Sequence, residues 1–258
     1  ANAITQTAGH NFNATATSQG ELRATATSRA ELSASAQMTA TVSSQDTATS
    51  IARGATATAI ADLTATVTAY NAVIMTGPPV LNDALRDNTQ GNNWDTAAQE
   101  GSGCAFANGV YHSTILQPGF FSPCFAQNPS FSNFSYQVQM KIVKGDQGGI
   151  CFRANTNNGA YYAFYINSNG TYDLETYNNG ISTGILRKGS SSAIKTGLNQ
   201  TNLIAVVANG NQIDLYVNMQ LIDSVTDSMY SSGQIGVVAE DINNPTDVAF
   251  NNAQVWTM

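Results

Sequence analysis

The 258-residue chain has few charged residues, and this scarcity excludes several classes of protein. Charged residues make up 10% of the sequence, with 10 Lys and Arg against 17 Asp and Glu. The formal net charge is −7 and the first lysine is Lys141, so the basic patch that nucleic-acid binding requires is missing. No run approaches the ~18 consecutive apolar residues of a membrane-spanning helix, and we therefore expect no transmembrane segment.

The residue types that carry nucleophilic catalysis are also scarce. The two histidines, His10 and His112, lie in different regions of the chain. A Gly-x-Ser-x-Gly sequence occurs once, at Gly180–Gly184, but no helix-like pattern follows it, so the strand-to-helix elbow of a hydrolase serine is not expected. These observations argue against an enzyme of the Ser-His type.

Proline is absent before Pro78, and Phe12 and Tyr70 are the only aromatic residues before it. All 3 Cys, all 6 Pro and the remaining aromatic residues follow. Because a hydrophobic core needs bulky side chains, we place the globular domain at residues 80–258. Residues 1–79 form an arm that is rich in Ala and Thr.

The arm alternates strictly between small or apolar and polar residues from Phe12 to Ser43. The alternation slips across Ser43–Ser50 and then resumes on the other parity from Ile51. Successive side chains of an extended strand point to opposite faces, so this pattern predicts a β-type arm. A strand of this length cannot satisfy its own backbone donors and acceptors, and it therefore needs a partner.

Three interpretations of the arm remain open. The first is an assembly strand that pairs with other copies of the chain, giving a homopolymer. The second is a low-complexity linker, and the third is an ice-binding surface built on the recurring Thr-x-Thr pairs. The apolar face of the assembly strand would consist of Phe12, Leu22, Leu32, Met38, Val42, Ile51, Ile60, Leu63 and Val67.

The globular part is predicted to be all-β. Turn signals such as Ser168-Asn169-Gly170 and Asn178-Asn179-Gly180 separate short alternating segments, which is typical of a sandwich. The expected strands are Val110–Leu116, Phe134–Val143, Gly149–Ala154, Ala160–Asn167, Thr171–Tyr177, Leu203–Ala208, Gln212–Val217, Gln220–Val225, Gly233–Ala239 and Val248–Trp256.

Several segments of the globular part carry a family resemblance. They are Trp94, Gly103–His112, Gly119–Cys124, Phe131–Met140, Gly145–Asn155 and Phe250–Trp256. Together they resemble the concanavalin A-like lectin/glucanase (laminin-G-like) sandwich, as found in secreted and membrane-anchored proteins of filamentous bacteria. There the domain often follows an Ala/Thr-rich segment. The resemblance covers about Leu81–Met258 and implies a jelly-roll fold, but this fold hosts lectins, glycosidases and structural modules alike.

Retaining glycosidases of the resembled superfamily carry two carboxylates on one strand in a Glu-x-Asp-x-x-Glu pattern. That pattern is absent, and the nearest match is Asp173-Leu174-Glu175. We therefore predict that the protein is not an enzyme and that it has no catalytic residues.

Carbohydrate binding is the alternative function. Aromatic faces with nearby amide, guanidinium or carboxylate groups bind sugars, and such residues lie on neighbouring expected strands. The same tyrosines are equally typical of residues that fill a β-sheet core. The candidate sugar-binding residues are Arg153, Asn155, Tyr161, Tyr165, Tyr172, Glu175 and Tyr177.

The resemblance also brings calcium and a disulfide into consideration. Calcium often accompanies laminin-G-like folds, and Asp241 and Asp247 are the best candidate ligands, although no cofactor is required. Cys104 and Cys124 flank an expected hairpin and match paired cysteines of the family, which implies a disulfide and an oxidising compartment. Cys151 is expected to be a buried thiol.

We therefore expect a secreted, extracellular structural protein, a subunit of a filament or surface layer held together by its arm. The alternative is a lectin-like cell-surface adhesion module on a stalk that binds glycans. The first residue is Ala1 rather than Met, which is consistent with a removed export signal or with a recombinant start.

Overall fold

The computed structural model describes residues 2–258, and within the first part of the chain it describes the side chains of residues 29, 30, 33 and 36 onwards. One long helix precedes a set of antiparallel strands. The elements are α1 (Asn2–Ile74), β1 (Leu81–Asp83), β2 (Ala98–Gln99), β3 (Ser102–Ala107), β4 (Val110–Ile115), β5 (Phe120–Phe125), β6 (Phe134–Lys144), β7 (Gln147–Asn155), β8 (Ala160–Asn167), β9 (Thr171–Asn178), β10 (Ile181–Ser190), β11 (Thr201–Asn209), β12 (Gln212–Val217), β13 (Gln220–Thr226), β14 (Gln234–Asp241) and β15 (Thr246–Thr257).

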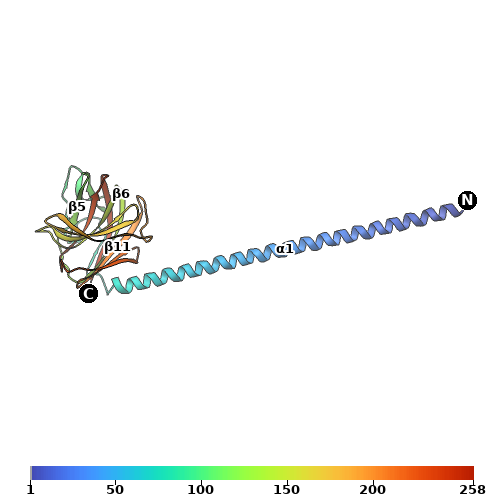
Figure 1. Ribbon diagram of the computed structural model, residues 1–258, viewed down its shortest axis with the longest axis horizontal. Coiled ribbons are helices and arrows are strands. Elements are labelled where there is room, and N and C mark those ends of the chain that lie inside the picture. Colours follow the sequence, from blue (N-terminus) through green and yellow to red (C-terminus); the bar gives the residue numbers. More distant parts are fainter. Residues whose placement is uncertain (1) are drawn as a thin grey trace. The chain divides into compact units, whose positions relative to one another are not determined.

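The strands form two antiparallel sheets that pack into a sandwich, which confirms the predicted all-β architecture (Figure 1). The larger sheet has the order β13-β12-β11-β6-β15-β4-β3-β2, and β1 pairs with β15. The smaller sheet has the order β10-β9-β8-β7-β14-β5. A hydrophobic core fills the space between them.

Alternation along each strand decides which side chains enter this core. On β9, Tyr172 and Leu174 belong to the core, whereas Asp173 and Glu175 lie at the intervening positions. The outer face of the smaller sheet carries a second apolar cluster, which includes Tyr161, Tyr165 and Tyr177 from β8 and β9. The chain therefore presents polar groups and tyrosines together on that outer face.

The arm is a helix of 73 residues, so the prediction of an extended β-type arm is wrong. Ala is the strongest helix former, and no proline interrupts the segment. Alternation between Ala and Thr also carries little burial energy on either face, so backbone hydrogen bonding decides the conformation. Threonine hydroxyls donate to the carbonyl four residues earlier, as at Thr41, Thr47, Thr49, Thr56, Thr58 and Thr68.

A helix satisfies its own backbone groups, so it removes the reason to expect pairing with other copies. Within the expected assembly face, Met38, Val42, Ile51, Ile60 and Leu63 are exposed on α1, and Val67 is half-buried. The side chains of Phe12, Leu22 and Leu32 lie outside the described part. In residues 2–258 no helical stretch combines the length and the apolarity needed to cross a membrane.

The chain divides into two compact units, residues 1–63 and Thr64–Met258. The second unit therefore includes the end of α1, which packs on the larger sheet. Tyr70 and Ile74 are 2% and 0% exposed and form a cluster with Tyr216 and Trp256. The Tyr70 hydroxyl donates to Gln137 Oε1 at 2.6 Å, which fixes the helix end to β6.

This packing predicts how a fragment should behave. A chain of residues 80–258 lacks Tyr70 and Ile74, and burying two such side chains contributes about 3–6 kcal/mol. We expect its free energy of unfolding in urea to fall by that amount relative to residues 64–258. The fragment 64–258 should match the sandwich transition of the full chain. Equal stability of the two fragments would show that the helix end contributes nothing.

Candidate functional site

The smaller sheet curls strongly toward its outer face. Phe121 on β5 and Tyr177 on β9 have ring centroids 4.8 Å apart, although three strands lie between them. Four strand spacings would separate them by ~19 Å in a flat sheet. Phe125 and Tyr161 also meet edge-to-face at 5.5 Å. The outer face is therefore concave, and aromatic side chains from its two sides meet across it.

Small residues form the middle of this concave face. The strand register brings Ala163 next to Cys151 and Cys151 next to Gly236, while Gly149 pairs with Val238. Since these side chains are short, the larger groups on β8, β9 and β14 can fold over the centre of the sheet. Cys151 is buried as expected, and burial raises the pKa of its thiol well above the usual value.

Three carboxylates lie on the same face. Asp173 and Glu175 are alternate residues of β9, where they pair with Tyr165 and Ala163. Glu240 lies on β14, where its Oε2 accepts a hydrogen bond of 2.7 Å from Gln147 Nε2. Glu175 Oε2 accepts a hydrogen bond of 2.8 Å from the Ser182 hydroxyl.

Burial and repulsion between negative charges raise the pKa of two of the carboxylates. Burial raises the pKa of Asp173 to about 7, and the negative charges of Glu175 and Glu240 add to the shift. Burial also raises the pKa of Glu240, against the lowering effect of the Gln147 hydrogen bond. Asp173 can therefore hold a proton near neutral pH beside two other carboxylates, an arrangement suited to acid–base chemistry.

Two polar atoms of this face are buried without a hydrogen-bond partner. They are Asp173 Oδ1 and the Tyr161 hydroxyl. Nearby, the Tyr165 and Tyr177 hydroxyls bond to each other at 3.1 Å, so those two groups are satisfied. A buried polar group without a partner is costly, and such groups are often those that a ligand engages.

The residues expected to bind sugar fall into different parts of the fold. Glu175, Tyr161, Tyr165 and Tyr177 lie together on the concave face. The three tyrosines are at most 2% exposed, and the Tyr161 and Tyr177 rings stack on each other at 4.6 Å. Their faces are therefore not open for stacking on a sugar. Tyr172 points into the core, with its hydroxyl donating to Asp223 Oδ2 at 2.9 Å.

Arg153 is 1% exposed and does not pair with Glu175. Its guanidinium donates to backbone carbonyls instead: to Ser132 O at 2.9 and 3.2 Å, to Tyr230 O at 3.1 Å and to Gly210 O at 2.8 Å. Arg153 therefore holds three loops together rather than facing a ligand.

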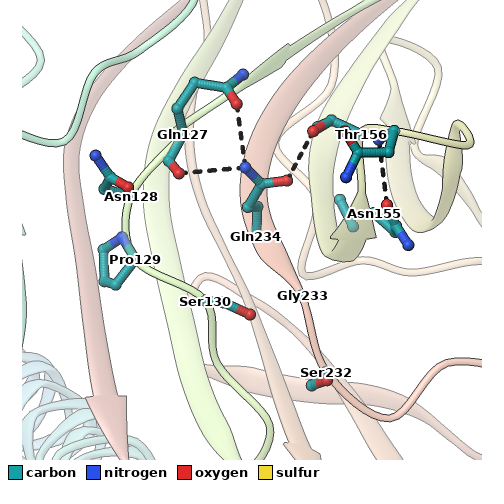
Figure 2. Close-up of a pocket in the computed structure, with 11 residues that line it drawn as sticks. Gln127, Asn128, Pro129, Ser130, Asn155, Thr156, Ser232, Gly233 and Gln234 are labelled. Atoms are coloured by element: carbon teal, nitrogen blue, oxygen red, sulfur yellow. Dashed lines mark hydrogen bonds between the residues drawn. The ribbon is translucent and has the colours of Figure 1, made fainter.

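Asn155 lines a polar cavity of about 550 Å³ at the end of the smaller sheet (Figure 2). Its walls come from residues 127–130 after β5, residues 154–157 at the β7–β8 turn and residues 232–234 before β14. Figure 2 shows Gln234 between Gln127 and Thr156, and its amide bonds to both, at 3.1 Å in each case. The cavity has amide and hydroxyl walls and no charged side chain.

The predicted disulfide is confirmed: Cys104 and Cys124 are joined, with their Cα atoms 5.8 Å apart.

The candidate calcium ligands lie in different settings. Asp247 bonds to His112 Nδ1 at 2.8 Å and to the Thr114 hydroxyl at 3.1 Å, whereas Asp241 is fully buried and neither of its carboxylate oxygens has a partner. Among the described side chains, those of residues 29, 30, 33 and 36–258, no three His, Cys, Asp or Glu gather as a metal centre.

Sequence reasoning singled out Asp173 only as part of an incomplete motif and Glu175 also as a sugar-binding candidate, and it missed Glu240 and Gln147. Glu240 lies six residues beyond Gln234 on a strand whose side chains alternate between the two faces, so the sequence predicts the face on which Glu240 lies. The sequence does not predict which residues lie next to Glu240, because that depends on the strand order and on the curvature of the sheet.

Solved structures of low sequence identity share this fold. The carbohydrate-binding module CBM66 from Bacillus subtilis is 18% identical and aligns over 64% of this chain and 96% of its own, with a TM-score of 0.54. The β-glucanase of Bacillus licheniformis is 12% identical, over 71% of this chain and 100% of its own, at 0.53. An endo-β-1,3-glucanase from Pyrococcus furiosus is 11% identical, over 72% and 97%, at 0.52. The likeness confirms the concanavalin A-like sandwich.

In sequence, no curated protein matches the chain. A family does match: the sequence model of the 3-keto-alpha-glucoside-1,2-lyase-like domain aligns with residues 83–255. This match contradicts the prediction that the protein is not an enzyme, because the family takes its name from a lyase and the fold is shared with glucanases. The absence of Glu-x-Asp-x-x-Glu excluded one arrangement of carboxylates, not every arrangement. The chain belongs to the family of 3-keto-α-glucoside-1,2-lyase-like domains.

Proposed function

We propose that the protein binds glycosides on the concave face and that the carboxylates there catalyse elimination from a 3-keto-glucoside. One observation carries the proposal: Asp173 and Glu175 lie on the same face of one strand, and Asp173 has a pKa of about 7. An acid and a base side by side at neutral pH are what such an elimination requires. The family match and the carbohydrate-binding neighbour support a glycoside as the substrate.

The chemistry follows from the ketone at C3, which makes the proton on C2 acidic. Glu175, whose carboxylate accepts the Ser182 hydroxyl, takes this proton, and its electron pair forms the C1=C2 double bond. The bond from C1 to the glycosidic oxygen breaks, and Asp173 gives its proton to that oxygen. In this proposal the Tyr161 hydroxyl, which has no partner, donates a hydrogen bond to the enolate oxygen that develops at C3.

The test uses two 3-keto-α-glucosides, one with a p-nitrophenyl and one with a methyl leaving group, and the full chain as enzyme. We expect release of the alcohol and a sugar product lighter by one water than the hydrolysis product in mass spectra. The corresponding glucosides without the ketone should remain intact, because their C2 proton is not acidic. Cleavage of those glucosides, or no cleavage of either keto sugar, contradicts the proposal.

Two variants separate the roles of the carboxylates. Glu175→Gln should lower the rate on both substrates by about 10²–10⁴-fold, the usual effect of a general base. Asp173→Asn should lower the rate by a similar factor on the methyl glycoside but by far less on the p-nitrophenyl glycoside, whose leaving group needs no proton. Asp46→Asn, which changes an exposed residue of α1, is the matched control and should have no effect.

The proposal also includes a compartment for the protein and a role for the arm. The Cys104–Cys124 disulfide supports an oxidising compartment outside the cytosol. The helix supports a spacer, since 73 residues at 1.5 Å each extend over ~110 Å. Because the arm is helical, it does not support the pairing of arm strands into a homopolymer.

A further inference from the structure

We propose that the protein has a second carbohydrate site, in which a neutral oligosaccharide lies across two adjoining pockets at the end of the smaller sheet. The first pocket is the cavity of about 550 Å³ in Figure 2. The second has a volume of about 330 Å³ and is lined by the segments around Asn133, Asn211 and Tyr230. Ser232 lines both, so the two pockets join.

The chemistry of the lining selects the ligand. Most residues that line the two pockets carry amide or hydroxyl groups, and Pro129, Ala154 and Tyr230 add apolar surface. No Asp, Glu, Lys, Arg or His contributes to either pocket. Side-chain amides and hydroxyls both donate and accept hydrogen bonds, as do the hydroxyls of a neutral sugar. An anionic ligand would find no countercharge. A purely apolar ligand would leave the amides unpaired, at a cost in affinity.

The pockets combine a fixed frame with free polar groups. Gln127, Gln234 and Thr156 bond to one another and hold the wall of the first pocket. By contrast, the side chains of Asn128, Ser130, Asn211 and Ser232 make no hydrogen bond within the described part of the chain, and all four residues are exposed. These groups remain available to a ligand, while the frame keeps them in place.

The floor beneath both pockets is rigid. The carbonyls that Arg153 binds, at Ser132, Gly210 and Tyr230, all belong to the lining of the second pocket. Gly233 lies against the neighbouring Ala154, so closely that a Cβ atom there would be 2.3 Å from the Ala154 carbonyl oxygen. This close approach connects the floors of the two pockets, because Gly233 and Ala154 line the first.

This site is separate from the concave carboxylates. The proposed catalytic residues Asp173, Glu175 and Tyr161 line neither pocket. The two sites are therefore formed by different residues. Binding at the pockets therefore does not rest on the elimination chemistry proposed above, and each can fail without the other.

The test is a titration of the full chain with malto-, cello- and laminari-oligosaccharides of two to five units, followed by calorimetry and amide NMR. We expect at least one neutral series to bind, with affinity rising from two to four units as the chain enters the second pocket. Shifts should appear at amides of residues 127–130 and 228–234. Tetragalacturonate, which is anionic, should not bind. Absence of binding by every neutral series up to ~10 mM, or shifts elsewhere only, overturns the proposal.

A triple variant gives the sharper test. Asn128→Ala, Asn211→Ala and Ser232→Ala remove free groups of both pockets without breaking a hydrogen bond of the fold. We expect the Kd for the tetrasaccharide to rise about 10-fold or more, since each group contributes one hydrogen bond. Gln200→Ala, an exposed amide outside the pockets, should bind as the wild type does. An unchanged Kd in the triple variant contradicts the site.

Discussion

Replacing Arg153 by methionine is expected to lower the free energy of unfolding by about 3–5 kcal/mol. The guanidinium is 1% exposed, and four of its hydrogen bonds end on carbonyls of Ser132, Gly210 and Tyr230. Methionine fills much of the volume but leaves these carbonyls without a donor. Because the charge has no carboxylate partner, its burial is offset by carbonyl dipoles alone.

Urea unfolding of the variant measures this loss. Arg187→Met is the control, since Arg187 is largely exposed and its contact with Asp223 is 3.7 Å long, so we expect a loss below about 1 kcal/mol. Arg153→Lys should not restore stability, because one ammonium group cannot reach three carbonyls from the place of a planar guanidinium. Similar losses at Arg153 and Arg187 would show that the buried hydrogen bonds contribute little.

The expected strands correspond well to the observed ones where burial and turn residues agree. The predicted segment Ala160–Asn167 coincides with β8, and Thr171–Tyr177 falls one residue short of β9. Both strands lie in the middle of a sheet, and Asn-Gly or similar turn sequences mark their ends. In such strands the alternation of large residues predicts which side chains are buried.

Two of the missed strands, β10 and β5, lie at the edges of the smaller sheet. The residues of β10, Ile181–Ser190, are almost all exposed, so their sequence carries no alternation between buried and exposed positions. β5, Phe120–Phe125, contains Pro123, which argues against a strand in sequence reasoning. It is tolerated because β5 is the last strand of its sheet.

The structure of the arm was wrongly predicted for a different reason. Its sequence alternates regularly, but burial of either face would contribute little free energy. The alternation from Phe12 to Ser43 is regular, but it mostly exchanges Ala for Thr or Ser. A period in the sequence predicts structure only when it separates large apolar side chains from polar ones. Near the end of α1, Tyr70 and Ile74 do so with a spacing of four, and they pack on the sandwich as a helix predicts.

The sequence predicts only part of the candidate site, because contacts between distant strands determine the rest. Asp173 and Glu175 share a face because they are alternate residues, and the sequence shows that. Burial is the main cause of the raised Asp173 pKa, and the charge of Glu240, which the curled sheet brings near from β14, adds to it. Sequence alone contains neither the order of the strands nor the curvature.

The setting of Asp173 predicts that the wild type loses stability as the pH rises. Its pKa is about 7 in the folded protein, above the usual value of 3.8. Between these values the folded state holds a proton that the unfolded state has released. The contribution of Asp173 is therefore fully present below about pH 4 and is lost progressively up to about pH 7. A shift of three pKa units corresponds to at most about 4 kcal/mol.

Asp173→Asn has no proton to lose, and it mimics the neutral acid in shape. We expect the variant and the wild type to be equally stable near pH 4, and the variant to be more stable at pH 8 by up to about 4 kcal/mol. Urea unfolding at each pH unit from 4 to 8 gives the two curves. The curve of stability against pH for Asp46→Asn, on α1, should run parallel to that of the wild type. Glu240→Gln removes a negative charge that raises the Asp173 pKa, so the loss of stability should end at a lower pH in this variant. Parallel curves for Asp173→Asn and the wild type would mean that Asp173 ionises in the folded protein as it does in water, and the acid of the proposed elimination would then be lost with it.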